Sequence, residues 1–255
     1  MSSVTETRPD TTKASARRRA VVDLGAGLAP LSAFTLVTQW CLALPTIYTV
    51  ETLGLYTLFS VVIIITLPDS LPKPGLGLAN RVTLCRATLI MPLAVLALSS
   101  APPDSRTAWW TIGISALAMV LDGIDGWISR RTACTTMFGA RFDMELDAFL
   151  ILILSVFVWR SGNTGGWVIL IGALRYIFVA STQIWPVLNR NLPPSQRRKT
   201  VCAIQGLALL VCLGPIVSST TATTVAATAL ILLIYSFCVD TWWLIRMTER
   251  NLSIR

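Results

Sequence analysis

Histidine is absent from the 255 residues of this chain, and charged residues make up only 13% of it. Without histidine, the sequence excludes Ser-His and Cys-His catalysis and every metal site that uses imidazole ligands. The cysteines form no C-x-x-C pair and most lie in apolar runs, so we interpret them as small buried side chains rather than zinc ligands. Any catalysis must therefore come from carboxylates, lysine, arginine, tyrosine or a metal with other ligands.

Hydrophobic residues, in contrast, make up 54% of the chain, and its mean hydropathy is +0.67. A single water-soluble core cannot bury this much apolar surface, so a lipid bilayer is the expected solvent. We therefore expect an all-α integral membrane protein with about eight transmembrane helices. The apolar stretches that are long enough, or nearly long enough, to cross a bilayer are residues 20–44, 50–68, 82–100, 108–128, 142–160, 166–188, 200–217 and 223–246.

The chain is expected to have four parts. Residues 1–19 are polar, end in three arginines and lack a signal peptide pattern, which indicates a disordered cytoplasmic tail. Residues 20–68 form an N-terminal pair of transmembrane helices, and the Pro- and Gly-rich residues 69–79 form a linker. Residues 80–250 then hold a core of six helices.

The positions of the basic residues predict the orientation in the membrane. With a cytoplasmic N-terminus, nearly all lysines and arginines fall in cytoplasmic segments, and the outer loops hold only Arg106 and Arg160. Both termini are then cytoplasmic, in the cell (plasma or inner) membrane. Basic edges that meet anionic lipid headgroups also explain the net charge of +8, so no nucleic-acid partner is needed.

Two pairs of aspartates lie at the cytoplasmic ends of consecutive predicted helices. Asp122 and Asp125 are three residues apart, Asp143 and Asp147 are four apart, and either spacing puts a pair on one helical face. Because a short loop at 131–141 joins the two helices, both pairs are expected to face one another. Four carboxylates so close together would repel one another unless a cation lay between them.

Hard oxygen ligands of this kind select Mg²⁺, Mn²⁺ or Ca²⁺, and two such ions could clamp a diphosphate. Gly126 and Gly139 leave room for a bulky ligand or a close helix, and Arg130 and Arg141 can donate hydrogen bonds to phosphate oxygens. Glu145 lies between the second aspartate pair on a different face, and we interpret it as a structural residue or one at the lipid edge. The cluster thus predicts a metal-dependent site for a phosphate-linked substrate.

This run resembles the signature of the CDP-alcohol phosphotransferase family, D-x-x-D-G-x-x-A-R, then eight residues, then G-x-x-x-D-x-x-x-D. Every spacing agrees, and the one departure is Ser129, where the family usually has alanine. The resemblance implies an enzyme that cleaves the diphosphate of a CDP-linked donor, releases CMP and joins the donor phosphate to an acceptor hydroxyl. It also implies a homodimer and a six-helix domain from residue 80 onward.

The same resemblance implies individual roles. Asp122, Asp125 and Asp143 would be ligands of Mg²⁺ or Mn²⁺, with two ions expected. Asp147 would lie at the metal and act as the general base on the acceptor hydroxyl. Gly126 and Arg130 would contact the cytidine diphosphate.

Further candidate substrate contacts lie outside the signature. Asn80, Thr83 and Arg86 share one helical face and resemble the N-x-x-T-x-x-R start of the first core helix in relatives that make phosphatidylglycerol phosphate or cardiolipin. Their other interpretation is helix capping for Asn80 and Thr83 and snorkelling for Arg86. Arg175, in mid-span, needs a partner, either a substrate phosphate or a core aspartate. The basic run 197–199 either lines the acceptor pocket or anchors the chain.

We expect a phosphatidyltransferase of phospholipid biosynthesis that uses CDP-diacylglycerol and a small hydroxyl acceptor, such as glycerol 3-phosphate or inositol phosphate. Many glycerol-phosphate enzymes of the family have Arg-Glu where this chain has Arg175-Tyr176, so the acceptor stays open. One alternative is transfer from CDP-choline or CDP-ethanolamine to diacylglycerol. An alternative of another class is a membrane cation transporter, although its carboxylates should spread along a pathway instead of clustering in one hairpin.

Overall fold

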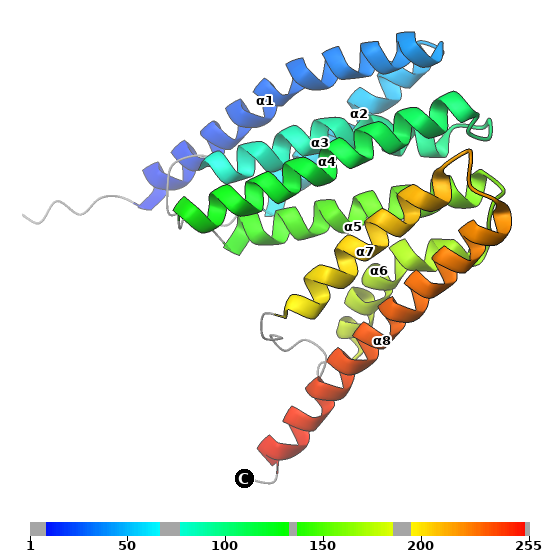
Figure 1. Cartoon of the computed structure of the whole chain (residues 1–255). Helices are drawn as coiled ribbons and strands as arrows, with labels where there is room; N and C mark the ends of the chain where they lie inside the picture. Colours follow the sequence, from blue (N-terminus) through cyan, green and yellow to red (C-terminus); the bar gives the residue numbers. More distant parts are fainter. Residues whose placement is uncertain (1–8, 67–76, 133–136, 186–194, 253–255) are drawn as a thin grey trace, which may run out of the picture. The chain divides into compact units, whose positions relative to one another are not determined.

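The computed structural model describes residues 9–66, 77–132, 137–185 and 195–252. Within these ranges the chain is helical and has no strand, which confirms the predicted all-α class. The helices, drawn in Figure 1, are α1 (Pro9–Leu42), α2 (Ile47–Thr66), α3 (Gly77–Leu98), α4 (Ser105–Thr132), α5 (Met137–Arg160), the 3₁₀ turn η1 (Gly166–Val168), α6 (Ile169–Ile184), α7 (Gln196–Leu213) and α8 (Ser219–Leu252).

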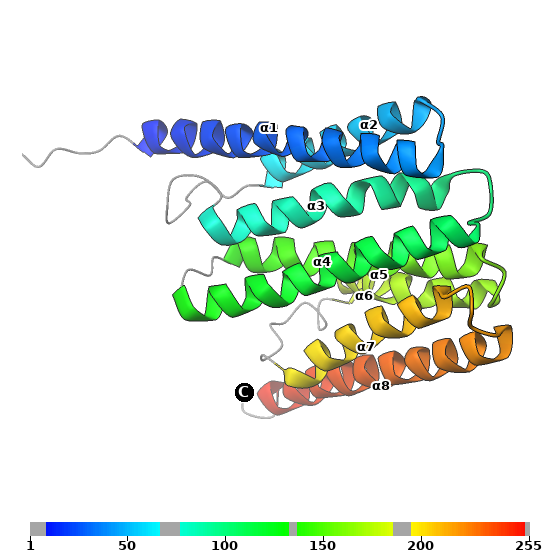
Figure 2. The ribbon, with the colours of Figure 1, turned by 45° about the horizontal axis from the view of Figure 1, so that its top comes forward.

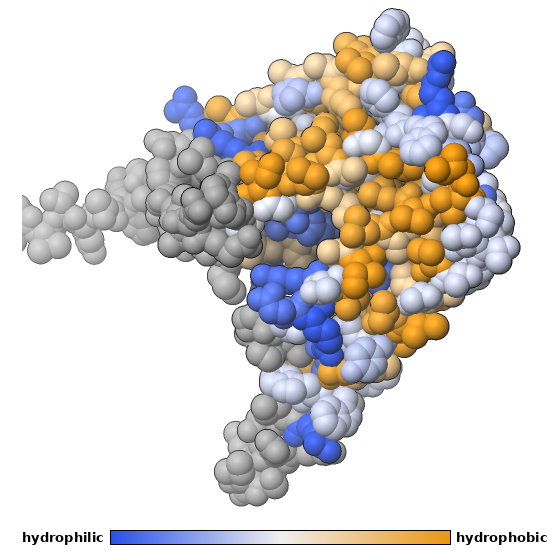
Figure 3. Space-filling view, viewed as in Figure 1, coloured by the Kyte–Doolittle hydropathy of each residue, from blue (hydrophilic) through white to orange (hydrophobic). Residues whose placement is uncertain are grey.

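Six helical segments of the described chain are long and apolar enough to cross a membrane: Ala20–Leu42, Ile47–Thr66, Arg81–Leu98, Ser105–Ile124, Gly166–Ile184 and Ser219–Leu244. The other two predicted spans, in α5 and α7, form helices that carry several charged residues near their N-terminal ends. The uncharged remainder of each is consequently shorter than the six spans. Figure 3 shows apolar side chains spread along the visible faces of the helices, as expected for a membrane protein.

Two helices begin earlier than the sequence predicted. α1 begins at Pro9, so residues 9–19 of the predicted tail are helical, and α3 begins at Gly77, inside the predicted linker. The lysine, alanines and arginines of residues 13–19 are good helix formers and extend the membrane helix beyond its apolar part. The rest of the predicted tail and most of the linker lie outside the described residues.

The chain divides into two compact units. The first comprises Met1–Ser99 and Gly113–Asp147, and the second comprises Ser100–Ile112 and Ala148–Arg255. Helices α4 and α5 therefore contribute residues to both units.

In the first unit, α1 and α2 pack against each other and along α3 (Figures 1 and 2). The apolar segment of α3 is 72% buried, against 33% and 17% for α1 and α2. Alanines 87, 94 and 97 of α3 are buried, and small side chains of this kind let membrane helices approach closely. α3 is therefore the central helix of this unit.

Polar contacts fasten the N-terminal helix pair to α3. The Asp23 carboxylate of α1, which is 9% exposed, pairs with the Arg81 guanidinium at 2.9 Å. From α2, the Tyr48 hydroxyl donates a hydrogen bond to the Pro92 carbonyl of α3 at 3.0 Å. In a medium without water, each such bond satisfies a polar group that would otherwise be costly to bury.

Gly27 of α1 lies directly against the Tyr56 side chain of α2. The Tyr56 hydroxyl of α2 donates to the Leu24 carbonyl at 2.9 Å, and a Cβ at position 27 would lie well under 3.0 Å from this hydroxyl oxygen. Leu84 of α3 would lie 3.5 Å from the same Cβ. The absence of a side chain at Gly27 therefore lets the buried Tyr56 reach the backbone of α1.

We expect Gly27→Ala to lower the melting temperature in detergent, because the added methyl displaces the Tyr56 hydroxyl and leaves a buried polar group unsatisfied, at a cost of about 1–3 kcal/mol. The double variant Gly27→Ala/Tyr56→Phe should recover part of this loss, because the oxygen that clashes is gone. Gly25→Ala is the matched control, since a Cβ there meets nothing within 4 Å. An equal loss in both single variants would contradict the assignment.

In the second unit, α7 and α8 form an antiparallel pair, and α6 packs on α8 through Phe178 and Phe237, whose ring centroids are 5.2 Å apart. The buried Gln205 side chain of α7 donates to the Ala229 carbonyl of α8 at 2.9 Å. At the N-terminal end of α7, Arg197 and Arg198 both pair with Asp240 of α8. Polar side chains thus hold the α7–α8 pair together at its middle and at one end.

Candidate functional site

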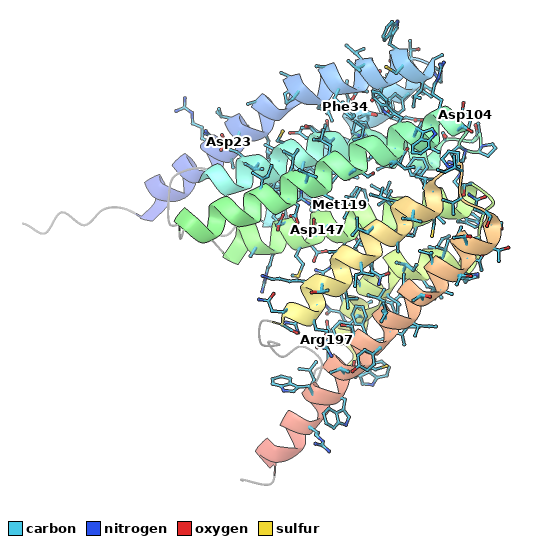
Figure 4. The ribbon with its side chains drawn as sticks, viewed as in Figure 1. Asp23, Phe34, Asp104, Met119, Asp147 and Arg197 are labelled. Carbon is cyan, nitrogen blue, oxygen red and sulfur yellow. The ribbon has the colours of Figure 1, made fainter. Side chains whose placement is uncertain are left out.

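Three of the four signature aspartates come together in the first unit. Asp122 lies on α4, and Asp143 and Asp147 lie one turn apart on α5, where Figure 4 labels Asp147. One carboxylate oxygen from each lies within 4.8 Å of the others, and all three side chains are half-buried. The predicted meeting of the two aspartate pairs is thus realised for these three residues.

The Arg86 guanidinium of α3 lies among these carboxylates. Its Nη1 is 2.8 Å from a carboxylate oxygen of Asp122 and 2.5 Å from one of Asp143, and its Nη2 is 2.5 Å from one of Asp147. Its Nε donates to the Ala118 carbonyl of α4 at 3.1 Å, and the residue is 0% exposed. A single buried arginine therefore contacts both helices of the aspartate hairpin.

Among the side chains that the structure describes, this cluster carries more negative than positive charge. Three carboxylates face one guanidinium, and partial burial strengthens the repulsion that the guanidinium leaves uncompensated. Further positive charge is therefore favoured at the site. Carboxylate oxygens in this number and at this spacing fit a hard divalent cation such as Mg²⁺ or Mn²⁺, so the residues present could hold the expected metal.

The contact between Arg86 and the aspartates was missed by the sequence analysis. Snorkelling, one of the two interpretations of Arg86, is wrong, because the side chain is buried in the site. The signal was present in the sequence, since a charged residue one turn inside a span needs a partner. The core aspartates, which the sequence offered as possible partners of Arg175, surround Arg86.

The other candidate residues have different placements. Thr83 lies one turn before Arg86 on α3 and is 2% exposed, and Gly126 and Gly139 are half-buried on α4 and α5. Asp125, Asn80 and Arg130 are helical, but the structure does not describe their side chains. Their predicted roles stay predictions.

The basic residues of the second unit also differ in their surroundings. Arg175 is half-buried on α6. Arg197 and Arg198 share the Asp240 carboxylate, which is only 10% exposed, so this part of the basic run connects α7 to α8. Asp240 lies between the two arginines and therefore has a structural role at this end of the α7–α8 pair.

Comparison with known proteins gives one match. The family model of the CDP-alcohol phosphatidyltransferases covers residues 76–243, which include the whole of α3 to α7 from Gly77 onward and nearly all of the spanning part of α8. The helices α1 and α2 lie outside the match. No curated protein and no solved structure matches the chain.

The match covers about two thirds of the chain and contains the complete aspartate signature as well as Arg86. The members of this family are membrane enzymes that transfer substituted phosphate groups, which agrees with the apolar helices and with a cluster of carboxylates suited to a divalent metal. The transporter alternative has no comparable support. The chain belongs to the CDP-alcohol phosphatidyltransferase family and is a transferase of the membrane.

Proposed function

We propose that the protein transfers a phosphatidyl group from CDP-diacylglycerol to the hydroxyl of a small polyol or phosphorylated polyol, with release of CMP. The observation that supports this most is the cluster of Asp122, Asp143 and Asp147 within the family domain, with carboxylate oxygens within 4.8 Å of one another. A diphosphate donor needs concentrated positive charge, which divalent metal ions supply. In the described chain, this cluster is the group of carboxylates that could hold such ions.

In this proposal the aspartates have two tasks. Asp122, Asp125 and Asp143, with Asp147 beside them, would hold Mg²⁺ or Mn²⁺, since both ions accept oxygen ligands of this kind. A bound divalent ion supplies charge stabilisation on the diphosphate oxygens. Gly126 and Gly139, which lack side chains, would leave space for the cytidine diphosphate, and Arg130 would donate to its phosphates.

The chemistry left to the protein is one proton transfer. The acceptor hydroxyl oxygen forms a bond to the phosphorus of the phosphatidyl group, the bond from that phosphorus to the bridging oxygen breaks, and CMP leaves with the electron pair. The hydroxyl proton goes to the Asp147 carboxylate, which acts as the general base. An aspartate is suited to this task only when its oxygens are near the attacking hydroxyl and free to accept the proton.

Polar and basic residues on α3 and α6 support the proposed acceptor. Thr83, Asn80 and Arg86 on α3 and Arg175 on α6 are candidate contacts to a phosphorylated polyol, such as glycerol 3-phosphate or inositol phosphate. We place the reaction at the cytoplasmic leaflet of the cell membrane, with both termini cytoplasmic, because the basic residues lie on that side. The active form is proposed to be a homodimer.

The test is CMP release by the purified protein in mixed micelles that contain CDP-diacylglycerol, Mn²⁺ or Mg²⁺ and one acceptor at a time. Release with a single acceptor, abolished by a chelator, is the expected result and identifies that acceptor. A parallel reaction contains CDP-choline or CDP-ethanolamine with diacylglycerol. CMP release in this second reaction alone would overturn the proposed donor.

The metal-ligand assignment predicts a further result. We expect Asp122→Asn and Asp143→Asn each to raise the Mn²⁺ concentration needed for half-maximal CMP release by about tenfold or more, because each removes one negative charge from the ligand set. Asp104→Asn is the matched control, because this exposed aspartate lies at the start of α4 and asparagine preserves its bond from the Thr107 amide. Metal titrations that match wild type in both test variants would refute the assignment.

A further inference from the structure

Each of the three guanidinium nitrogens of Arg86 contacts an oxygen atom of α4 or α5. Nε binds the Ala118 carbonyl, Nη1 contacts Asp122 and Asp143, and Nη2 contacts Asp147. The residue is 0% exposed, so these contacts replace water completely. A buried guanidinium is stable only when paired in this way, and the carboxylates in turn repel one another less while it is present.

The aspartates that contact Arg86 are the ones proposed to hold the metal. One oxygen each of Asp122, Asp143 and Asp147 pairs with the guanidinium, and these three residues form the carboxylate group suited to a metal. A guanidinium at 2.5–2.8 Å from these oxygens occupies the space in which a metal ion would bind, and two cations there would repel each other. Arg86 and a metal ion therefore compete for the same ligands.

We propose that Arg86 is the cation that holds the aspartate cluster together when metal is absent, and that a divalent ion binds by displacing its guanidinium. This inference rests on the proposed metal site. It gives Arg86 a positioning role that precedes substrate binding. While Arg86 pairs with Asp147, its Nη2 is engaged with the carboxylate proposed as the general base.

Displacement can be observed in the wild-type protein without substrate. Arginine labelling by phenylglyoxal, mapped by mass spectrometry of the peptides, is compared in chelator and in saturating Mn²⁺. In chelator, Arg86 should be protected because it is buried and fully paired, and Mn²⁺ should raise its labelling rate toward that of an exposed arginine. Arg81, on the same helix with a side chain that is 61% exposed, is the internal control and should not change.

A variant gives an independent measurement. Arg86→Gln should bind Mn²⁺ about tenfold or more tightly than wild type in a titration of free Mn²⁺ by electron paramagnetic resonance, because no charge-assisted hydrogen bond has to be broken. In chelator, the same variant should melt about 5 °C or more below wild type, because the three half-buried carboxylates lose the guanidinium that contacts all of them. Arg81→Gln should leave the Mn²⁺ affinity at the wild-type value, and any loss of melting temperature from its broken pair with Asp23 should be the same in chelator and in Mn²⁺.

Arg86→Lys covers the case in which Arg86→Gln does not fold. Lysine keeps one charge but cannot bridge three carboxylates, so its Mn²⁺ affinity and its melting temperature in chelator should lie between those of wild type and of a fully uncompensated cluster. An affinity for Mn²⁺ in Arg86→Lys equal to or weaker than that of wild type would overturn the competition.

The outcomes separate this inference from the proposed function. Mn²⁺ binding with Arg86 still protected overturns the inference and leaves the proposed function standing. Increased labelling of Arg86 by Mn²⁺, in a protein that releases no CMP with any donor and acceptor, supports the inference and overturns the proposed function. No Mn²⁺ binding by wild type or Arg86→Gln overturns both.

Discussion

Asp147→Asn should reduce CMP release by about a hundredfold to ten-thousandfold, the usual contribution of a general base. Asparagine has the same shape but cannot take the proton from the acceptor hydroxyl. Its carbonyl oxygen can still accept the hydrogen bond from Arg86 Nη2, so the helix arrangement around α5 should persist. The measurement is CMP release under the conditions that give the highest wild-type rate, together with the melting temperature of each protein.

Glu145→Gln is the matched control for Asp147→Asn. Glu145 lies on the same helix two residues earlier, its side chain is exposed, and the change removes one negative charge in the same way. Its CMP release should stay near wild type. Turnover retained in Asp147→Asn, or lost equally in Glu145→Gln, would refute the assignment of Asp147 as the base.

Gly172→Ala should cause a large loss of stability in the second unit, because this glycine lies against the backbone of α5. A Cβ at this position of α6 would lie 2.8 Å from both the Leu152 nitrogen and the Ser155 Oγ of α5, and its closest approach is to the Leu152 backbone. Backbone cannot move aside as a flexible side chain can, so α5 and α6 must separate. We expect a loss of about 3 kcal/mol, read as a lower melting temperature in detergent and a lower yield of folded protein.

Gly113→Ala is the control for Gly172→Ala, since a Cβ on α4 at this position meets nothing within 4 Å. There the exchange should be neutral or should stabilise the helix by up to about 1 kcal/mol, because alanine has the higher helix propensity. Equal melting temperatures for Gly172→Ala and Gly113→Ala would show that α5 and α6 do not depend on this close contact.

The candidate site was predicted well where it depends on spacing within one helix. Asp143 and Asp147 share a face of α5 because four residues make about one helical turn, and the short connection to α4 returns the chain beside Asp122. The contact of these aspartates with Arg86 could not be predicted from spacing within one helix. Arg86 precedes Asp122 by 36 residues and lies on a different helix, so only the packing of α3 against α4 and α5 determines their contact.

The N-terminal helix pair shows the same division. Its two spans follow from hydropathy, because an apolar stretch of this length has to lie in the bilayer. Hydropathy does not reveal which helices pack against each other. An apolar side chain can face lipid or a neighbouring helix, because both surroundings are apolar. The contacts of Asp23 with Arg81 and of Tyr48 with Pro92 identify α3 as the helix that α1 and α2 cover.

The sequence by itself determined that this protein is an all-helical membrane enzyme of the CDP-alcohol phosphatidyltransferase family, because hydropathy and a fixed aspartate spacing are local properties of the chain. Only the tertiary structure decided that Arg86 pairs with Asp122, Asp143 and Asp147 and that Asp240 binds Arg197 and Arg198. These pairings join residues that are far apart in the chain. Their formation depends on how the helices pack, and a buried charge takes whichever partner that packing brings within reach.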